Sequence, residues 1–308
     1  MKTRYDIHPD FRLLSAIHPP LREKSIYSIQ KMMGLLFRAP QGSRDVRAER
    51  VSIPEEGGRT VRALLFVPRT GKPAGSLLYC HGGGYAFPAA PYHYALARIY
   101  ARRAGCRVLF PDYRLAPGNP FPAAAEDCFT AYRWLLSETG APVAVGGDSA
   151  GATLAMGVCL MARDEQLPAP CAQLLIYPAV GVCGETESMR LYTDSPMCNS
   201  RDMAQYGAWY GQDETAGKKE YRSPVEAESL EGVPRTYIET AEFDCLRDGA
   251  ILYGEKLRRG GIEAEIHNTR GTVHGFDMML RSPIVKERIT GRVAFLKNAF
   301  SEEKGASR

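Results

Sequence analysis

The sequence predicts an α/β fold, with a mostly parallel sheet of about eight strands and helices on both of its faces. From residue 75 onward, short strand-like runs alternate with helical patterns. Most of the strand-like runs are short and apolar, which is typical of parallel strands buried on both faces. The chain has 308 residues, of which 44% are hydrophobic and 24% charged, as expected for a globular protein with a large core. We therefore expect residues 1–308 to form a single domain.

The first elements precede this alternation. Residues 5–38 show helical patterns interrupted by His18-Pro19-Pro20, and no strand comes before them. Apolar residues recur at helical spacing in the second half of the segment, at Ile26, Ile29, Met32, Met33, Leu36 and Phe37. Their side chains could roof a pocket, but we favour packing in the core.

Two runs, 46–54 and 59–68, are joined by a turn at 55–58 and predict an antiparallel start to the sheet. The remaining predicted strands are 75–80, 106–111, 143–146, 172–177, 235–241 and 263–268, and the predicted helices are 92–104, 122–137, 150–165, 247–259 and 283–300. Between Val182 and Leu230 no strand is predicted. A connection of that length usually has its own structure. We expect a helical cap formed by about 1–45 and about 184–228, over the strand ends where open α/β sheets bind ligands.

Composition excludes several classes of function. The formal net charge is +4, without a long basic block, so nucleic-acid binding is not expected. The charged N-terminal residues do not resemble a signal peptide, no apolar run is long enough to span a membrane, and a cytoplasmic location is expected. The eight cysteines are scattered, without C-x-x-C pairs or a metal-like cluster with histidine. We expect free thiols and no metal or other cofactor.

A nucleophile elbow is predicted around Ser149. A short apolar strand, the motif Gly147-Asp148-Ser149-Ala150-Gly151 and a helix rich in small residues follow one another directly. The serine of such an elbow has strained backbone angles, and side chains two positions away would collide. The free N–H groups at the start of the helix favour negative charge beside the serine. Ser149 is therefore the predicted nucleophile.

The loop His81-Gly82-Gly83-Gly84-Tyr85 directly follows a predicted strand. Successive glycines let the backbone approach a ligand and leave N–H groups free to point at an oxygen. We expect an oxyanion hole with Gly83 and Gly84 as the main donors, Gly82 as an alternative and the Ala150 N–H as the third. His81 is expected to hold the loop rather than to act as a base.

A serine nucleophile needs a base, and His274 is the candidate. It lies in a predicted loop after the last strand, whereas the other histidines lie in the N-terminal segment, before the glycine loop, at a helix start or inside a strand, at positions His8, His18, His81, His93 and His267. Position and elimination therefore favour His274.

The acid that orients this histidine should follow the preceding strand. Residues 242–248 offer three carboxylates there, Glu242, Asp244 and Asp248. Asp244 lies where the strand ends, Asp248 lies where a helix begins and suits a cap, and Glu242 is less well placed. We choose Asp244 and keep Asp248 in reserve. The chain order Ser149, Asp244, His274 is that of an α/β-hydrolase triad.

Six motifs occur in order between residues 75 and 276: His81-Gly82-Gly83-Gly84, Asp112-Tyr113-Arg114-Leu115-Ala116-Pro117, Pro120-Phe121-Pro122-Ala123-Ala124, Gly147-Asp148-Ser149-Ala150-Gly151, Asp244-x-Leu246-x-Asp248 and His274-Gly275-Phe276. Together they resemble the hormone-sensitive-lipase-like group of α/β-hydrolases, which includes bacterial carboxylesterases and acetyl esterases. The resemblance implies the triad, the oxyanion hole and a two-part helical cap. It also implies that Asp112 and Arg114 form a charged scaffold network behind the glycine loop, to which Asp148 belongs.

The sequence departs from the pattern of this group at Cys245-Leu246, where members often have Pro-Leu, and at Tyr85-Ala86-Phe87, where Trp or Phe variants are usual. Neither departure removes a catalytic group, but the second is expected to narrow the acyl pocket. Aromatic residues near the glycine loop and in the expected cap would shorten that pocket, namely Tyr85, Phe87, Tyr206, Trp209 and Tyr210.

The resulting hypothesis is a metal-free serine carboxylesterase that hydrolyses small esters with short acyl chains, acetyl first. Two other interpretations stay open: an amidase or formamidase of the same fold, and a ligand receptor on a non-catalytic hydrolase scaffold. A lipase acting at oil–water interfaces is less favoured, since the sequence shows no apolar lid helix. A homodimer is also left open.

Overall fold

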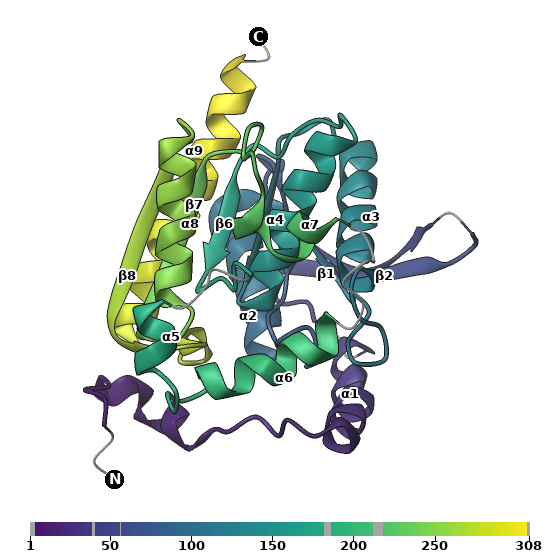
Figure 1. Cartoon of the computed structure of the whole chain (residues 1–308). Helices are drawn as coiled ribbons and strands as arrows, with labels where there is room; N and C mark the ends of the chain where they lie inside the picture. The colour runs from purple at the N-terminus through teal and green to yellow at the C-terminus, as the bar shows by residue number, and fades with distance from the viewer. Residues whose placement is uncertain (1–3, 39–40, 56, 182–185, 212–217, 307–308) are drawn as a thin grey trace.

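One eight-stranded sheet forms the centre of the molecule, in the order β1-β2-β4-β3-β5-β6-β7-β8 (Figure 1). The computed structural model describes residues 4–38, 41–55, 57–181, 186–211 and 218–306. β1 and β2 pair antiparallel, β2 pairs antiparallel with β4, and the strands from β4 to β8 are parallel. The strands are β1 (Val46–Pro54), β2 (Thr60–Pro68), β3 (Ser76–Cys80), β4 (Arg107–Pro111), β5 (Val143–Asp148), β6 (Gln173–Ile176), β7 (Thr236–Phe243) and β8 (Ala264–Val273). The predicted fold class is confirmed.

Helices cover both faces of the sheet, so its central strands are buried on both sides. On β3, Leu78 packs in a core cluster with residues of α3, α4 and α8, and the adjacent Leu77 packs in a second cluster with residues of α2 and α9. This alternation is the two-residue period of a strand. The helical elements are η1 (Pro9–Ala16), α1 (Glu23–Arg38), α2 (Pro91–Tyr100), η2 (Ala101–Gly105), α3 (Ala123–Glu138), α4 (Ala150–Asp164), α5 (Glu187–Leu191), α6 (Ser200–Tyr210), α7 (Lys219–Arg222), η3 (Pro224–Glu226), α8 (Arg247–Arg259), η4 (Phe276–Met278) and α9 (Pro283–Ala306).

The last strand is longer than predicted. It continues to Val273 because of a bulge, where the pairing moves from Ala241–Thr269 to Phe243–Val273. Gly271 lies in the bulge with φ 68° and donates its N–H to the Glu242 carboxylate at 2.6 Å. The consequence is that His274 directly follows a strand end instead of lying in a long loop.

The predicted helix 92–104 is also divided. The α-helix ends at Tyr100 and continues as one π-helical turn, closed by a hydrogen bond from the Cys106 N–H to the Ala101 carbonyl at 3.3 Å. Gly105 then adopts φ 64°, which turns the chain into β4.

Figure 1 shows α1, α5 and α6 together at one end of the sheet, which is where the parallel strands end. These helices come from the two segments for which a cap is predicted, and the assignment of a cap remains a prediction. The Gln30 side chain of α1 donates to the carbonyls of Ala86 and Ala116 at 2.9 and 2.8 Å. The N-terminal segment is therefore bound to the loops at this end. Among the described residues, no helix has both the length and the apolar character needed to cross a membrane.

Candidate active site

Ser149 lies at the tip of a sharp turn between β5 and α4. Its backbone angles are φ 53° and ψ −124°, a combination that non-glycine residues rarely adopt. A Cβ atom at Gly147 or Gly151 would collide with the Cys80 carbonyl. The predicted strained turn and the steric reason for its glycines are therefore confirmed, and the turn holds the serine hydroxyl out from the strand end.

Three side chains from three strand ends meet at this point. The Ser149 Oγ lies 2.8 Å from His274 Nε2, and His274 Nδ1 lies 2.7 Å from the Asp244 Oδ2. The other oxygen of Asp244 accepts the Leu246 N–H at 3.0 Å. Both Asp244 and His274 are buried, with 0% and 8% exposure. Since the imidazole nitrogens face a carboxylate on one side and a hydroxyl on the other, the ring can move a proton to and from Ser149.

The other two carboxylates considered for the acid role are bound elsewhere. Asp248 accepts the Ser188 N–H at 2.7 Å and pairs with Arg247 at 2.8 Å. Glu242 binds Gly271 in the bulge. Neither lies beside the imidazole.

The two glycines expected as the main donors of an oxyanion hole lie at the cavity beside Ser149. Gly83 and Gly84 have positive φ angles of 128° and 58°, and both line this cavity with Ala150. The structure gives the N–H groups of Gly83, Gly84 and Ala150 no hydrogen-bond acceptor among the described residues. The prediction of Gly82 as an alternative donor is wrong, because the Gly82 N–H is donated to the Asp148 Oδ1 at 3.1 Å and is not free for a ligand.

Asp148 joins the glycine loop to the strand that carries Ser149. It is fully buried and accepts hydrogen bonds from Tyr79 Oη at 2.9 Å, Tyr92 Oη at 3.2 Å and His93 Nε2 at 3.0 Å, besides the Gly82 N–H. Burial by itself would raise the pKa of this carboxyl, but its interactions with His93 and the Tyr79 hydroxyl hold the pKa below its usual range. Asp148 is therefore an anion that holds the loop in position.

His93 is a functional residue that was not predicted from the sequence. Its Nδ1 accepts the Ala90 N–H at 2.9 Å, which leaves the proton on Nε2, directed at Asp148. The sequence did indicate one thing: His93 is the third residue of a helix that begins with Pro91. A side chain at that position can bind the backbone N–H of the residue that caps the helix, here Ala90.

His81 lies under the glycine loop. Its Nδ1 lies 2.7 Å from the Gly82 carbonyl oxygen, and its ring stacks on Tyr113 with centroids 4.3 Å apart. Burial and the nearby His93 lower the pKa of His81 to about 3, so this ring is neutral near pH 7.

Asp112 and Arg114, which are predicted to form a charged scaffold network behind the loop, each pair with a different residue. Asp112 pairs with Arg62 at 2.5 Å, whereas Arg114 pairs with Asp127 of α3 at 3.0 Å. The link to the loop is made by the residue between them, since the Tyr113 hydroxyl donates to the His81 carbonyl at 2.7 Å.

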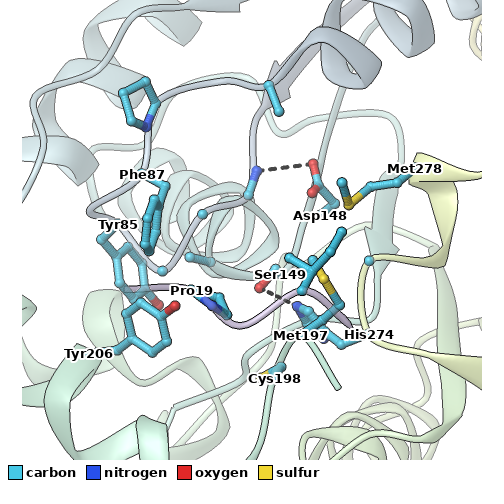
Figure 2. Close-up of a pocket in the computed structure, with 18 of the residues that line it drawn as sticks. Pro19, Tyr85, Phe87, Asp148, Ser149, Met197, Cys198, Tyr206, His274 and Met278 are labelled. Carbon is cyan, nitrogen blue, oxygen red and sulfur yellow. Dashed lines mark hydrogen bonds between the residues drawn. The ribbon is translucent and has the colours of Figure 1, made fainter. Parts of the chain in front are cut away.

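A cavity of about 470 Å³ opens over Ser149. Figure 2 shows Tyr85, Phe87 and Tyr206 on one side of the serine, and His274, Met197 and Met278 on the other. Of the five aromatic residues predicted in the pocket, these three line it. Trp209 instead packs at 2% exposure with Ile26, and Tyr210 stacks on Tyr85 at 3.7 Å and faces a neighbouring cavity of about 590 Å³.

The N-terminal segment also lines the cavity, which corrects the expectation that its apolar residues pack in the core. Ile29, Met32 and Met33 face the cavity, and Met32 is 64% exposed. Ile26 does pack in a core cluster. The side chains of Leu36 and Phe37 lie outside the described part of the structure.

The seven cysteines of the described residues carry free thiols, as expected, and Cys183 lies outside those residues. Two of these thiols lie close together beside Asp244, with the Cys198 Sγ 3.7 Å from the Cys245 Sγ. Their hydrogen bond and burial raise the pKa of Cys198 well above its usual value. The sequence spacing gave no indication of this pair.

A buried ion cluster joins α9 to β7 and η4. Arg292 of α9 has 0% exposure and makes two hydrogen bonds to each of Glu239 in β7 and Asp277 in η4, at 2.6 to 3.0 Å. Asp277 lies three residues after His274. This cluster was not predicted from the sequence, since its members are far apart along the chain.

Known proteins resemble this chain in sequence and in fold. A family profile described as alpha/beta hydrolase fold matches residues 77–278. The carboxylic ester hydrolase LipN and the esterase LipI of Mycobacterium tuberculosis are each 37% identical, over 73% and 65% of this chain, and the chain spans 63% and 65% of their lengths. The crystal structure of the esterase LipW from Mycobacterium marinum superposes with a TM-score of 0.87 at 28% identity, covering 96% of both chains.

Proposed function

The chain belongs to the hormone-sensitive-lipase-like group of the alpha/beta hydrolase family, and from its site we propose that it is a serine carboxylesterase for short acyl esters. One observation carries the proposal: Ser149, His274 and Asp244 form a continuous hydrogen-bonded chain of 2.8 and 2.7 Å at the floor of an apolar cavity. No described contact occupies the N–H groups of Gly83, Gly84 and Ala150 beside it.

In the proposed reaction His274 Nε2 takes the proton of Ser149 as its Oγ attacks the ester carbonyl. The N–H groups of Gly83, Gly84 and Ala150 donate to the oxyanion that forms, each contributing about 3 kcal/mol to lowering the barrier. Asp244 stabilises the imidazolium. His274 then gives its proton to the departing alkoxide, which leaves an acyl group on Ser149. Water, deprotonated by His274, attacks this acyl-enzyme and releases the carboxylic acid.

The two sides of the cavity define the substrate. The leaving alcohol must lie toward His274, because this histidine protonates it. The alcohol group therefore contacts Met197 and Met278, and we propose an apolar, aliphatic or aromatic, alcohol. The acyl group extends the other way, toward Tyr85, Phe87 and Tyr206. Gly84 contacts the Tyr206 ring so closely that a Cβ atom would overlap with it, and this close wall supports a short acyl chain such as acetyl.

The test is hydrolysis of an aryl acetate by the wild-type enzyme and by Ser149→Ala. We expect the variant to lose turnover, and turnover retained by Ser149→Ala would disprove the mechanism. Asp244→Asn should lower kcat by about 10⁴-fold, as in other triads whose histidine loses its carboxylate. Asp248→Asn is the matched control, because its carboxylate binds Ser188 and Arg247 instead of the imidazole.

Two measurements separate the other interpretations. An amidase would turn over an acetyl anilide as well as the matched acetyl ester, whereas an esterase would show a strong preference for the ester. A receptor on a non-catalytic scaffold would leave Ser149 unlabelled by a fluorophosphonate probe.

A further inference from the structure

Three potential metal ligands lie together behind the imidazole. The Cys198 Sγ, the Cys245 Sγ and a carboxylate oxygen of Asp244 are all within 4.8 Å of one another, and all three residues are buried. Cys198 precedes α6, whereas Cys245 directly follows Asp244 at the end of β7. Because the two cysteines are 47 residues apart, only the fold brings them together.

Their spacing fits a tetrahedral thiolate site. In such a site, with Zn–S bonds of about 2.3 Å, two sulfurs stand roughly 3.7 Å apart. The Sγ atoms of Cys198 and Cys245 are separated by the same 3.7 Å. Two sulfurs and one carboxylate oxygen are a donor set for Zn²⁺ or the softer Cd²⁺, and they leave a fourth position for water.

The ligands can be reached from the substrate cavity. Cys198 lines the cavity over Ser149, as Figure 2 shows, and Cys245 lines the neighbouring cavity. Both cavities are bordered by Met203, Tyr206 and Leu246. A cation that enters with solvent can therefore approach the two sulfurs without unfolding of the core.

We propose that Cys198, Cys245 and Asp244 form an inhibitory site for a thiophilic divalent cation, Zn²⁺ or Cd²⁺. The inhibitory part rests on the proposed esterase function. Asp244 can direct its charge either to His274 Nδ1, now at 2.7 Å, or to the cation. Metal binding should therefore remove the support that the base needs during catalysis.

Binding is tested independently of activity. The 308-residue chain is reduced, freed of reductant and titrated with Cd²⁺ while the ultraviolet thiolate-to-cadmium charge-transfer band is recorded. We expect one Cd²⁺ per chain for the wild type and for Ser149→Ala. Cys198→Ser and Cys245→Ser should each lose this band, and circular dichroism shows whether each variant is folded. Cys171→Ser and Cys183→Ser are the matched controls and should keep it.

Inhibition is measured on the same samples with an aryl acetate. Saturating Cd²⁺ or Zn²⁺ should lower kcat on the order of 10⁴-fold, the loss expected when a triad acid is removed, and a chelator should restore it. Cys198→Ser should resist the metal. The site is disproved if the wild type gives no band or if both cysteine variants keep it, and its inhibitory role is disproved if metal-saturated enzyme is fully active. Absence of hydrolysis by metal-free enzyme would instead disprove the proposed function, while the band still decides the site.

Discussion

Replacement of Asp148 by asparagine should disturb both stability and catalysis, although the two side chains have the same shape. One carboxylate oxygen of Asp148 accepts the Gly82 N–H and the other accepts the Nε2–H of His93. The Gly82 N–H can only donate. His93 is also fixed as a donor, because its Nδ1 is occupied by the Ala90 N–H. Whichever way the new amide at position 148 is turned, its NH₂ group faces one of these two donors.

The size of the effect follows from these contacts. The variant loses one hydrogen bond to a charged group and leaves one buried donor unpaired, which together cost about 3 kcal/mol of the free energy of unfolding. A turned amide also releases the glycine loop. Misplacing one proposed oxyanion donor should lower kcat by about 10²-fold.

The assay combines urea denaturation with hydrolysis of an aryl acetate. Asp45→Asn is the control, because Asp45 pairs with Arg102 on the surface and should contribute less than about 1 kcal/mol. A second-site change, His93→Gln in the Asp148→Asn background, supplies an amide oxygen that can accept from the NH₂ group of the new asparagine and should recover at least about 1 kcal/mol. If Asp148→Asn matched the wild type in both stability and kcat, the assignment of His93 and Gly82 as obligatory donors would be wrong.

Three further predictions concern separate parts of the molecule. The pKa of His81 is about 3 in the folded chain and about 6.5 when unfolded, so below pH 6.5 the unfolded chain binds a proton that the folded chain does not. The free energy of unfolding should therefore fall by up to about 1.4 kcal/mol per pH unit as the pH drops below 6.5. His81→Phe should flatten this slope, which is measured by urea unfolding at pH 6 and pH 5. Tyr206→Ala opens the Ser149 cavity toward its neighbour and should raise kcat/KM for hexanoyl relative to acetyl esters by about tenfold or more, whereas an unchanged ratio would place the acyl group elsewhere. Arg292→Met leaves Glu239 and Asp277 buried without their cation and should lower the free energy of unfolding by about 3–5 kcal/mol in thermal or urea unfolding; a loss below about 1 kcal/mol would contradict the buried cluster.

Much of the site could be predicted because its residues follow strand ends. Ser149, Asp244 and His274 each come after a strand of the parallel part of the sheet, and parallel strands bring their carboxyl ends to one edge. Local sequence patterns therefore sufficed to choose these three residues and the glycine loop.

The features that could not be predicted depend on contacts between distant segments. The loss of Gly82 as a donor depends on Asp148, 66 residues away, and the orientation of Asp148 depends on His93, 55 residues away. The apolar pattern of α1 indicates which residues share a helix face but not whether that face meets the core or a cavity, which is why the prediction for Met32 and Met33 was wrong. The position of Trp209 could not be predicted for the same reason, since its neighbour Ile26 lies on α1.

The contact of α9 with the centre of the sheet also has a consequence for the order of events during synthesis. Glu239 and Asp277 leave the ribosome before Arg292, so the guanidinium that holds both carboxylates arrives last. Until then, burial of the two anions is unfavourable, which delays closure of β7 and η4 around the strand ends that carry Asp244 and His274. We therefore expect a nascent chain to assemble the proposed site around Ser149 only when its C-terminal helix forms, and a chain that ends before Arg292 should remain both unfolded at this edge and inactive.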